Sequence, residues 1–251
     1  MQKYLEEMSK GLSDKLFFIN RIDTDLIVDF GCADGQLLNY ISKVKPNIKL
    51  IGYDIDEDMI KKSKQKYPNI YFTDKWDDVI DFVNKSGCIN TSILLSSVIH
   101  EVYSYSMSTK IKYFWNNLAF NNIFKYVIIR DMIPSNKFDK MNIIDIKKIK
   151  QLSDKKYLED FESVWGDIGN SFRTMLHWLL KYRYTENWNR ELKENYLPIT
   201  IEYLKSNWIP NNWKIIYEDH YTYDFIKNQI KKDFDIILDE PTHLKMIIQK
   251  N

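Results

Sequence analysis

The sequence predicts an α/β protein with a doubly wound, mostly parallel sheet, and two observations support this prediction. First, short apolar runs typical of buried strands alternate with helical patterns, giving five such units in about 130 residues. Second, the leading run, Leu26 to Val28, ends in a turn of small residues, Gly31 to Gly35, and a helical pattern begins at Gln36. The free N–H groups of that helix lie where the strand ends.

The turn and a downstream acid predict a nucleoside pocket. Small residues at Gly31, Ala33 and Gly35 let the backbone pass close to a ligand, because larger side chains would occupy its space. Asp54 ends the second apolar strand, Leu50 to Tyr53. In doubly wound sheets, an acid about 20 residues beyond the turn hydrogen-bonds the ribose hydroxyls of a bound nucleoside.

The spacing of the turn indicates which nucleoside. The dinucleotide fingerprint requires a third glycine where this chain has Gln36. The chain instead has Asp29, Gly31, Ala33 and Gly35, an acid followed by three small residues at alternate positions. This pattern resembles the first motif of the class I S-adenosylmethionine-dependent methyltransferases, with Ala33 in place of the usual middle glycine.

The resemblance implies a Rossmann-like fold, a methyltransferase activity and the cofactor S-adenosyl-L-methionine. It implies that Asp54 binds the ribose and that Asp74, after the third strand, meets the adenine. Trp76 either stacks on the base or fills the core. The cofactor-binding residues expected on this basis are Asp29, Gly31, Cys32, Ala33, Gly35, Asp54, Ile55, Asp74, Lys75, Trp76 and Ser97.

The resembled sheet has seven strands with an antiparallel last strand, and its closing hairpin is expected at Trp213 to Tyr217 and Leu244 to Ile248. Between strands five and six the chain has helical patterns that the resembled fold lacks. We therefore expect a Rossmann-like domain of residues 1–134 and 197–251, and an inserted helical cap of residues 135–196 that selects the substrate. The expected cap helices are Phe138 to Lys150, Lys156 to Trp165, Phe172 to Tyr184 and Trp188 to Asn195.

The N-terminal segment, Met1 to Asn20, has the apolar spacing of a helix. It either packs against the sheet or, as in the resembled family, folds over the cofactor. Met1 to Lys15 is charged and lacks an apolar core, so no signal peptide is expected. No window approaches 18 apolar residues. The expected localisation is therefore cytoplasmic, without membrane contact.

The best catalytic candidates are His100 and Glu101, which directly follow the fourth strand, Ser92 to Val98. Ligands of open α/β sheets bind outside the carboxyl ends of the strands. Methyl transfer mainly requires alignment, and a base is needed only where the acceptor must lose a proton. His100 could instead be a structural imidazole and Glu101 a cap of the following turn. Arg130 and Asp131, after strand five, form either part of the site rim or a local ion pair.

One expected cap helix, Phe172 to Tyr184, has alternative interpretations. Its polar face could meet an anionic substrate or, with the interleaved aromatic residues, single-stranded nucleic acid, or the segment could be an amphipathic lid helix with a buried apolar face. The polar face has Arg173, His177, Lys181 and Tyr184, and the apolar face has Met175, Leu176, Leu179 and Leu180.

Composition favours a small-molecule acceptor over a nucleic acid. The chain of 251 residues is 44% hydrophobic and 28% charged, and its net charge of +1 offers little attraction to a phosphate backbone. Two cysteines, Cys32 and Cys88, are too few for a disulfide framework. No metal site is expected, because His220 and His243 lack partners at metal-ligand spacing.

Two alternative functions remain open. One is an RNA or tRNA methyltransferase that grips its substrate with the inserted helices, although the Asn-Pro-Pro-Tyr type of signature is absent after strand four. The other is a non-catalytic subunit that binds the cofactor only to stabilise a partner complex. The sequence does not determine the oligomeric state.

Overall fold

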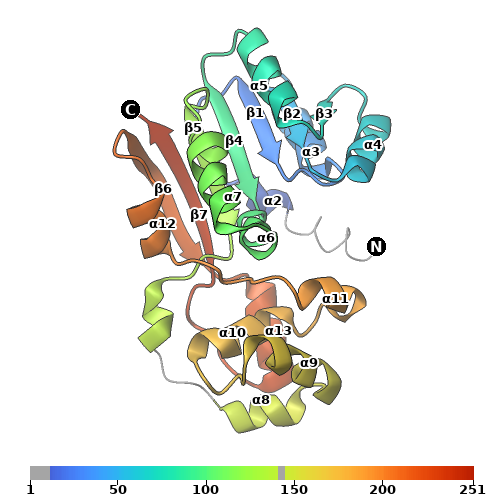
Figure 1. Ribbon diagram of the computed structural model, residues 1–251, viewed down its shortest axis with the longest axis vertical. Coiled ribbons are helices and arrows are strands. Elements are labelled where there is room, and N and C mark those ends of the chain that lie inside the picture. Colours follow the sequence, from blue (N-terminus) through green and yellow to red (C-terminus); the bar gives the residue numbers. More distant parts are fainter. Residues whose placement is uncertain (1–11, 141–144) are drawn as a thin grey trace.

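The computed structural model describes residues 12–140 and 145–251 of the chain. It contains a seven-stranded sheet in the order β3-β2-β1-β4-β5-β7-β6, in which β7 pairs antiparallel with both β5 and β6 and the other neighbouring strands pair in parallel (Figure 1). The predicted fold class, including the antiparallel last strand, is confirmed. The strands are β1 (Leu26–Phe30), β2 (Lys49–Tyr53), β3 (Tyr71–Thr73), β4 (Thr91–Ser96), β5 (Tyr126–Asp131), β6 (Trp213–Tyr221) and β7 (His243–Lys250).

Helices associated with the sheet lie on both of its faces, and further helices form a separate layer beneath it (Figure 1). The first group is α2 (Leu12–Lys15), α3 (Gln36–Val44), α4 (Glu57–Lys66), α5 (Trp76–Lys85), α6 (Ile99–Tyr105), α7 (Ser108–Tyr113), the π-helical η1 (Phe114–Ala119) and α12 (Ile201–Asn207). The second group is η2 (Asn136–Lys140), α8 (Ile146–Leu152), α9 (Lys155–Trp165), α10 (Phe172–Lys181), η3 (Thr185–Asn187), α11 (Trp188–Glu191) and α13 (Asp224–Phe234).

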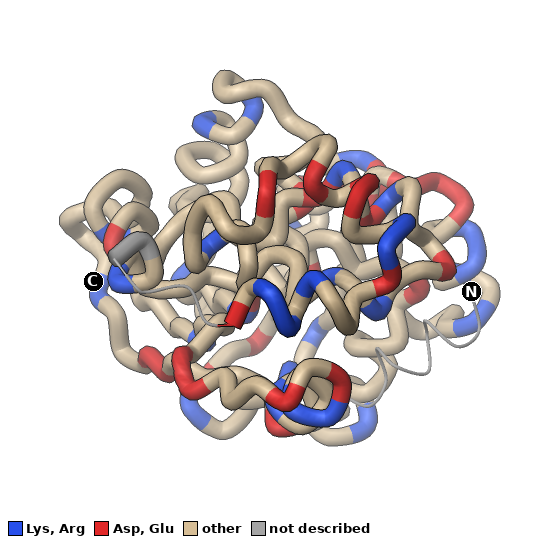
Figure 2. Tube along the Cα trace, turned by 90° about the horizontal axis from the view of Figure 1, so that it is seen from below, with Lys and Arg blue, Asp and Glu red and all other residues tan. Residues whose placement is uncertain are grey.

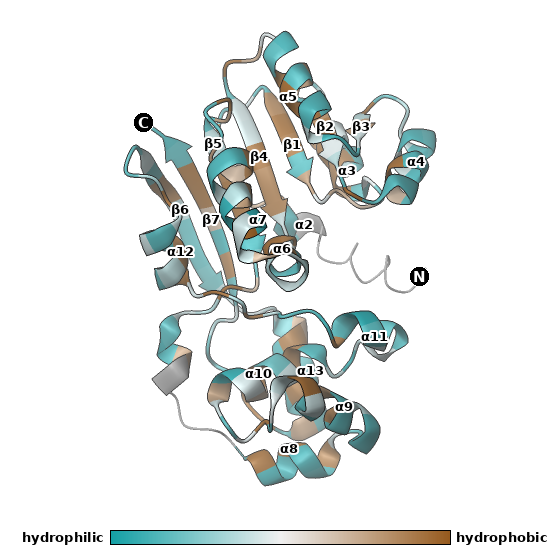
Figure 3. Cartoon of the chain, in the orientation of Figure 1, coloured by the Kyte–Doolittle hydropathy of each residue, from teal (hydrophilic) through white to brown (hydrophobic). Residues whose placement is uncertain are grey.

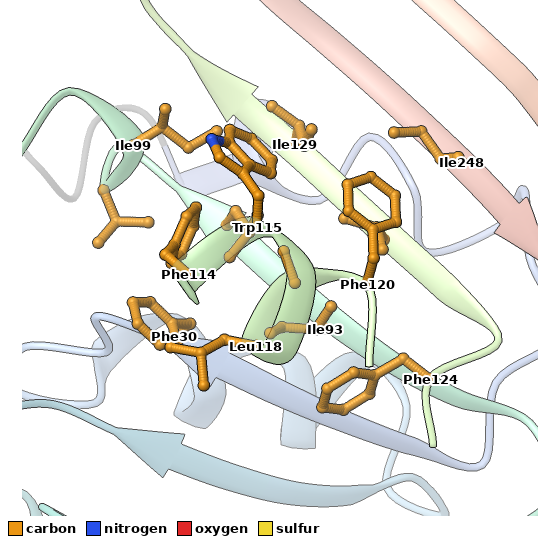
Figure 4. Packing of buried hydrophobic residues seen from close by; sticks show 14 of the residues in the cluster. Phe30, Ile93, Ile99, Phe114, Trp115, Leu118, Phe120, Phe124, Ile129 and Ile248 are labelled. Carbon is orange, nitrogen blue, oxygen red and sulfur yellow. The ribbon is translucent and has the colours of Figure 1, made fainter. Parts of the chain in front are cut away.

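The central strands are buried along their whole length, which explains their continuous apolar runs. Every residue of β1, β4 and β5 is buried, as expected for parallel strands covered by helices on both faces. On one face, η1 packs Phe114, Trp115 and Leu118 over the sheet (Figure 4). On the other face, α3 contributes Leu38 and Ile41 to a second core. Figure 3 shows the hydrophobic residues concentrated on these strands.

The helical layer, which we call the cap, has a hydrophobic core of its own. Phe161 and Trp178 of the inserted region pack in one cluster with Ile230 and Phe234 of α13. Because α13 belongs to the connection between β6 and β7, two separate stretches of chain build the cap. In Figure 1 the arrowheads of β1 and β4 point toward the cap, so the carboxyl ends of these strands face it.

Of the expected helix of Met1 to Asn20, residues 1–11 lie outside the described residues, Leu12–Lys15 is helical, and the prediction is wrong for residues 16–20. The helix ends at Lys15 and continues as turns. Phe17 and Phe18 are both buried, although a helix would direct successive side chains about 100° apart. Turns therefore allow both rings to enter the core.

Three expected cap helices also differ from the prediction, and one of them is α10, which ends at Lys181 instead of Tyr184. Helical structure within the expected helix of Phe138 to Lys150 lies in two pieces, η2 and α8. The expected helix of Trp188 to Asn195 ends at Glu191. There the Lys181 ammonium donates hydrogen bonds to the carbonyls of Glu191 and Glu194. Conversely, β6 continues beyond the expected Tyr217 to Tyr221. Within residues 12–140 and 145–251, every helix falls short of the length and apolarity needed to cross a bilayer.

Candidate functional site

The turn after β1 has an alternating left-handed backbone. The φ angles are +80° at Gly31, +46° at Ala33 and +75° at Gly35. The N–H groups of Gly31 and Cys32 donate to the Tyr53 carbonyl at 2.8 and 3.0 Å. These bonds fix the turn against the end of β2. The turn, Gly31 to Gly35, is hereafter called the glycine loop.

Glycine is required at both ends of the glycine loop. A Cβ on Gly31 would lie 2.7 Å from Val98 Cγ2, and one on Gly35 would lie 2.7 Å from the Phe72 ring. Both positions also have the left-handed φ that favours glycine. From the sequence, we attribute the small residues of the glycine loop to ligand access alone. In the structure, neighbouring protein side chains also limit the size of residues 31 and 35.

Asp54 joins the end of β2 to the glycine loop. Its Oδ2 accepts from the Ala33 N–H at 2.8 Å and its Oδ1 accepts from the Asp56 N–H at 3.0 Å. A carboxylate has about four lone-pair directions, so acceptor capacity remains for two hydroxyl groups. The structure thus brings together the predicted turn and the predicted ribose-binding acid.

The residues expected around the adenine lie farther along the same edge of the sheet. Ile55 is 81% exposed and extends an apolar side chain beside Asp54. Asp74 is half-buried and Lys75 is exposed just after β3. The Trp76 ring packs edge-on against Phe30 and Tyr53, with centroids 5.6 and 5.3 Å apart. Of the two interpretations of Trp76, this packing supports a core residue.

Asp29 is a buried acid on β1 with a lysine partner that the sequence did not reveal. Burial raises the pKa of Asp29 to about 7, although the charge of Lys15 opposes the shift. Burial also lowers the pKa of Lys15 to about 8. Burial raises the pKa of the Cys32 thiol, so this cysteine is a neutral, small residue of the glycine loop.

His100 lies in the first turn of α6 and is paired with Asp131 at the end of β5. The His100 Nδ1 lies 2.8 Å from Asp131 Oδ1, and the backbone N–H of Ile99 donates to Asp131 Oδ2 at 2.7 Å. Asp131 therefore caps α6 and orients the imidazole. Burial disfavours a charged His100, but the charge and hydrogen bond of Asp131 outweigh burial and raise the histidine pKa.

The suggested ion pair between Arg130 and Asp131 is wrong. Successive side chains of a strand point to opposite faces, so the two groups have different partners. The Arg130 Nε donates to Asp14 at 3.2 Å, and its guanidinium also donates to the Ser97 hydroxyl. Ser97, an expected cofactor residue, has a left-handed φ of +59°.

The cap contributes two charged residues beside His100. Glu194 Oε2 lies 3.9 Å from His100 Nε2. Arg190 bonds to Glu101 and to Glu194, both at 2.7 Å. Glu101 therefore pairs across the seam between the sheet and the cap. The sequence does not identify Glu194 and Arg190 as site residues, because their approach to α6 depends on how the cap packs against the sheet.

The polar face of α10 holds the cap together. His177 and Lys181 are both buried, so the predicted contact of these two side chains with an anionic substrate is wrong. The Lys181 ammonium donates to two backbone carbonyls and lies 4.7 Å from the centroid of the Tyr196 ring. Burial lowers the pKa of Lys181 to about 8. The apolar face is buried, as the lid interpretation predicts, with Met175, Leu176, Leu179 and Leu180 in the cap core.

Comparison with known sequences finds short stretches of similarity to methyltransferases. No protein-family model matches the chain. Trans-aconitate 2-methyltransferase of Afipia carboxidovorans is 27% identical over 99 residues, which are 39% of this chain and 37% of that protein. A protein of Invertebrate iridescent virus 6 that is named as a methyltransferase is 44% identical over 46 residues, 18% of this chain and 17% of its own length. The chain thus spans less than two-fifths of either relative.

Solved structures resemble the chain over nearly its whole length. The plantazolicin methyltransferase BamL, crystallised with a triazolic desmethylPZN analog and SAH, has a TM-score of 0.52 and 13% identity, and the match covers 96% of this chain and 84% of BamL. An S-adenosylmethionine-dependent methyltransferase of Anabaena variabilis has a TM-score of 0.51 and 11% identity, with 97% and 83% covered. Together with the strand order, these likenesses show that the chain has the fold of the class I, Rossmann-like S-adenosylmethionine-dependent methyltransferases.

Proposed function

We propose that the chain is an S-adenosylmethionine-dependent methyltransferase that modifies a small-molecule acceptor at the seam between the sheet and the cap. The observation that carries this proposal is the hydrogen bond between the Ala33 N–H and Asp54, which holds a left-handed glycine loop beside an acid with free acceptor capacity. The presence of SAH in the BamL crystals supports the same cofactor for this fold.

The residues at the edge of the sheet fit each part of the cofactor. The glycine loop offers backbone close to the methionine portion, and Asp54 offers two acceptors to the ribose hydroxyls. Ile55 offers an exposed apolar surface to the adenine, and Asp74 offers an acceptor to its amine. The other residues proposed to line this site are Asp29, Cys32, Lys75, Trp76 and Ser97.

His100 and Glu101 are proposed to act on the acceptor. When bound, S-adenosyl-L-methionine would supply a methyl group on a positively charged sulfur, which would leave with the electron pair of the broken bond as the acceptor's lone pair forms the new one. The His100 Nε2 faces the cap and takes the acceptor's proton, while Asp131 holds Nδ1 and stabilises the imidazolium. Glu101 orients the acceptor together with Arg190.

The proposed role of His100 predicts a specific pH dependence. Asp131 raises the pKa of His100, and only the neutral imidazole accepts a proton, so activity should fall as the pH drops through this raised value. In Asp131→Asn the attraction is lost while burial remains, so the acidic limb of kcat/KM should move to lower pH. A pH profile of the two proteins measures this shift. An unmoved limb would show that the titrating group is not His100.

The inserted region, residues 135–196, is proposed to select the acceptor. Two residues of this region support the proposal. Arg190 forms an ion pair with Glu101, and Glu194 approaches His100. The cap core also includes α13, so we propose that the β6–β7 connection assists in holding this region in place.

A small-molecule acceptor is favoured over RNA by the distribution of charge. Figure 2 shows acidic and basic residues interspersed over the cap end of the molecule. Lys181, on the helix face expected to meet an anionic substrate, is buried among backbone carbonyls. A protein that binds through many phosphates loses affinity steeply with added salt. We therefore expect turnover that changes little with salt.

The proposal is tested by incubating the chain with radiolabelled S-adenosylmethionine and fractionated cell extract. Label recovered in small molecules would support it, and label recovered in RNA would favour the tRNA or RNA alternative. Tight cofactor binding with no labelled product in any fraction would instead identify a non-catalytic partner subunit.

A further inference from the structure

We propose that His100, Glu101 and Glu194 form a binding site for one divalent metal ion. One ligand atom from each of these residues lies within 4.8 Å of the others. Two carboxylates and an imidazole form a donor set that suits Mn²⁺, Fe²⁺ or Zn²⁺ and leaves coordination positions open. His100 and Glu101 come from α6, and Glu194 comes from the cap.

The imidazole is already oriented as a metal-ligating histidine would be. Its Nδ1 is held by Asp131 at 2.8 Å, and only 6% of the residue is exposed. The Nε2 is directed toward the cap, where Glu194 Oε2 lies 3.9 Å away and beyond hydrogen-bond reach. A carboxylate behind the imidazole fixes its tautomer and makes it a better metal ligand. A metal ion between Nε2 and the Glu194 carboxylate would bridge two groups that are too far apart to hydrogen-bond each other.

The two carboxylates are already arranged around a positive charge. Arg190 donates from Nε to Glu194 and from a terminal nitrogen to Glu101, both at 2.7 Å. This guanidinium stands in for the cation. The Arg190 side chain is 49% exposed, so it can move outward while the two carboxylates turn to an ion. A divalent ion has twice the charge of the guanidinium and also attracts the imidazole lone pair.

The metal site has a consequence for the chemistry at the seam. In the metal-free chain His100 Nε2 is the proposed base. An ion bound to Nε2 would replace it in that role, because a divalent ion lowers the pKa of a bound acceptor hydroxyl group. Metal binding depends on the positions of three side chains, so it can be measured without methyl transfer.

The test is calorimetric titration of the chelator-stripped full chain with MnCl₂ and ZnCl₂, without cofactor, at a pH of about 8, because metal binding requires deprotonated ligands and is favoured by higher pH. We expect one ion per chain. His100→Gln and Glu194→Gln should weaken binding at least about tenfold. His220→Gln is the matched control, because this histidine pairs with Glu218 on β6 and should leave metal binding unchanged.

Arg190→Gln provides the sharpest discrimination. Removal of the competing cation should tighten metal binding by roughly tenfold, a gain that a purely structural cluster would not produce. If Glu194→Gln does not fold, Glu101→Gln replaces it as the ligand variant, because Glu101 is only half-buried. Absence of binding at about 1 mM metal, unchanged binding in the ligand variants, or no gain in Arg190→Gln would overturn the site. Binding of S-adenosylhomocysteine (SAH) is titrated separately. A failure of the metal-site proposal can therefore be distinguished from a failure of the proposed function.

Discussion

Replacement of Asp54 by alanine is expected to weaken the binding of S-adenosylhomocysteine by about 1–3 kcal/mol, a loss of roughly 5- to 150-fold. Asp54 holds the Ala33 N–H at 2.8 Å and still has acceptor capacity for the two ribose hydroxyls. The alanine variant leaves these hydroxyls without their acceptors and also releases the glycine loop. Isothermal titration calorimetry with S-adenosylhomocysteine measures the loss directly.

Asp58→Ala is the control for this measurement. Asp58 has the same charge, its side chain is 79% exposed, and its ion pair with Lys61 lies on the surface of α4. The control should bind S-adenosylhomocysteine as the unmodified chain does. If Asp54→Ala also bound it with unchanged affinity, Asp54 would not be the ribose-binding acid.

Replacement of His100 by glutamine is expected to reduce kcat by about 10²- to 10⁴-fold. Glutamine retains a polar group near Asp131 but has no basic nitrogen to take the acceptor's proton. Cofactor affinity should change little, because His100 pairs with Asp131 rather than with the glycine loop. Single-turnover transfer of labelled methyl to the identified acceptor measures the rate, and calorimetry measures the cofactor affinity.

His220→Gln is the matched control for the rate measurement, since it removes a half-exposed imidazole from β6. Its rate should equal that of the unmodified chain. A His100→Gln variant that folds and transfers methyl at the normal rate would assign His100 to structure alone.

The fold and the position of Asp54 beside the glycine loop could be predicted because their signals are local. The strands β1, β4 and β5 are buried on both faces, so each is a continuous apolar run in the sequence. The glycine loop follows from residues that are adjacent in the chain, and the distance from this loop to Asp54 reflects one strand–turn–helix–strand unit.

The contacts at the seam between the sheet and the cap could not be predicted, because they join distant segments of the chain. Arg130 and Asp131 are adjacent in sequence, yet strand alternation directs Asp131 to His100 and Arg130 to Asp14. Glu194 reaches His100 only because the cap folds beneath the carboxyl edge of the sheet. No local pattern in the sequence contains that packing.

The cap illustrates a second limit of sequence patterns. The periodicity of α10 distinguishes a polar face from an apolar face but does not reveal whether the polar face meets water. In the structure, Lys181 and His177 are buried against backbone carbonyls of Glu191, at the end of α11, and of Glu194, which follows it. The contribution of α13 to the cap core was equally hidden, because that helix lies in a later connection.

The central claim is that the glycine loop and Asp54 together hold the cofactor, and a crystal structure of the full chain with S-adenosylhomocysteine tests it most directly. The predicted result has the ribose hydroxyls on the Asp54 carboxylate, the homocysteine portion against Gly31 to Gly35, and the sulfur facing His100. Ligand density elsewhere on the molecule, with the loop and Asp54 unoccupied, would contradict the claim.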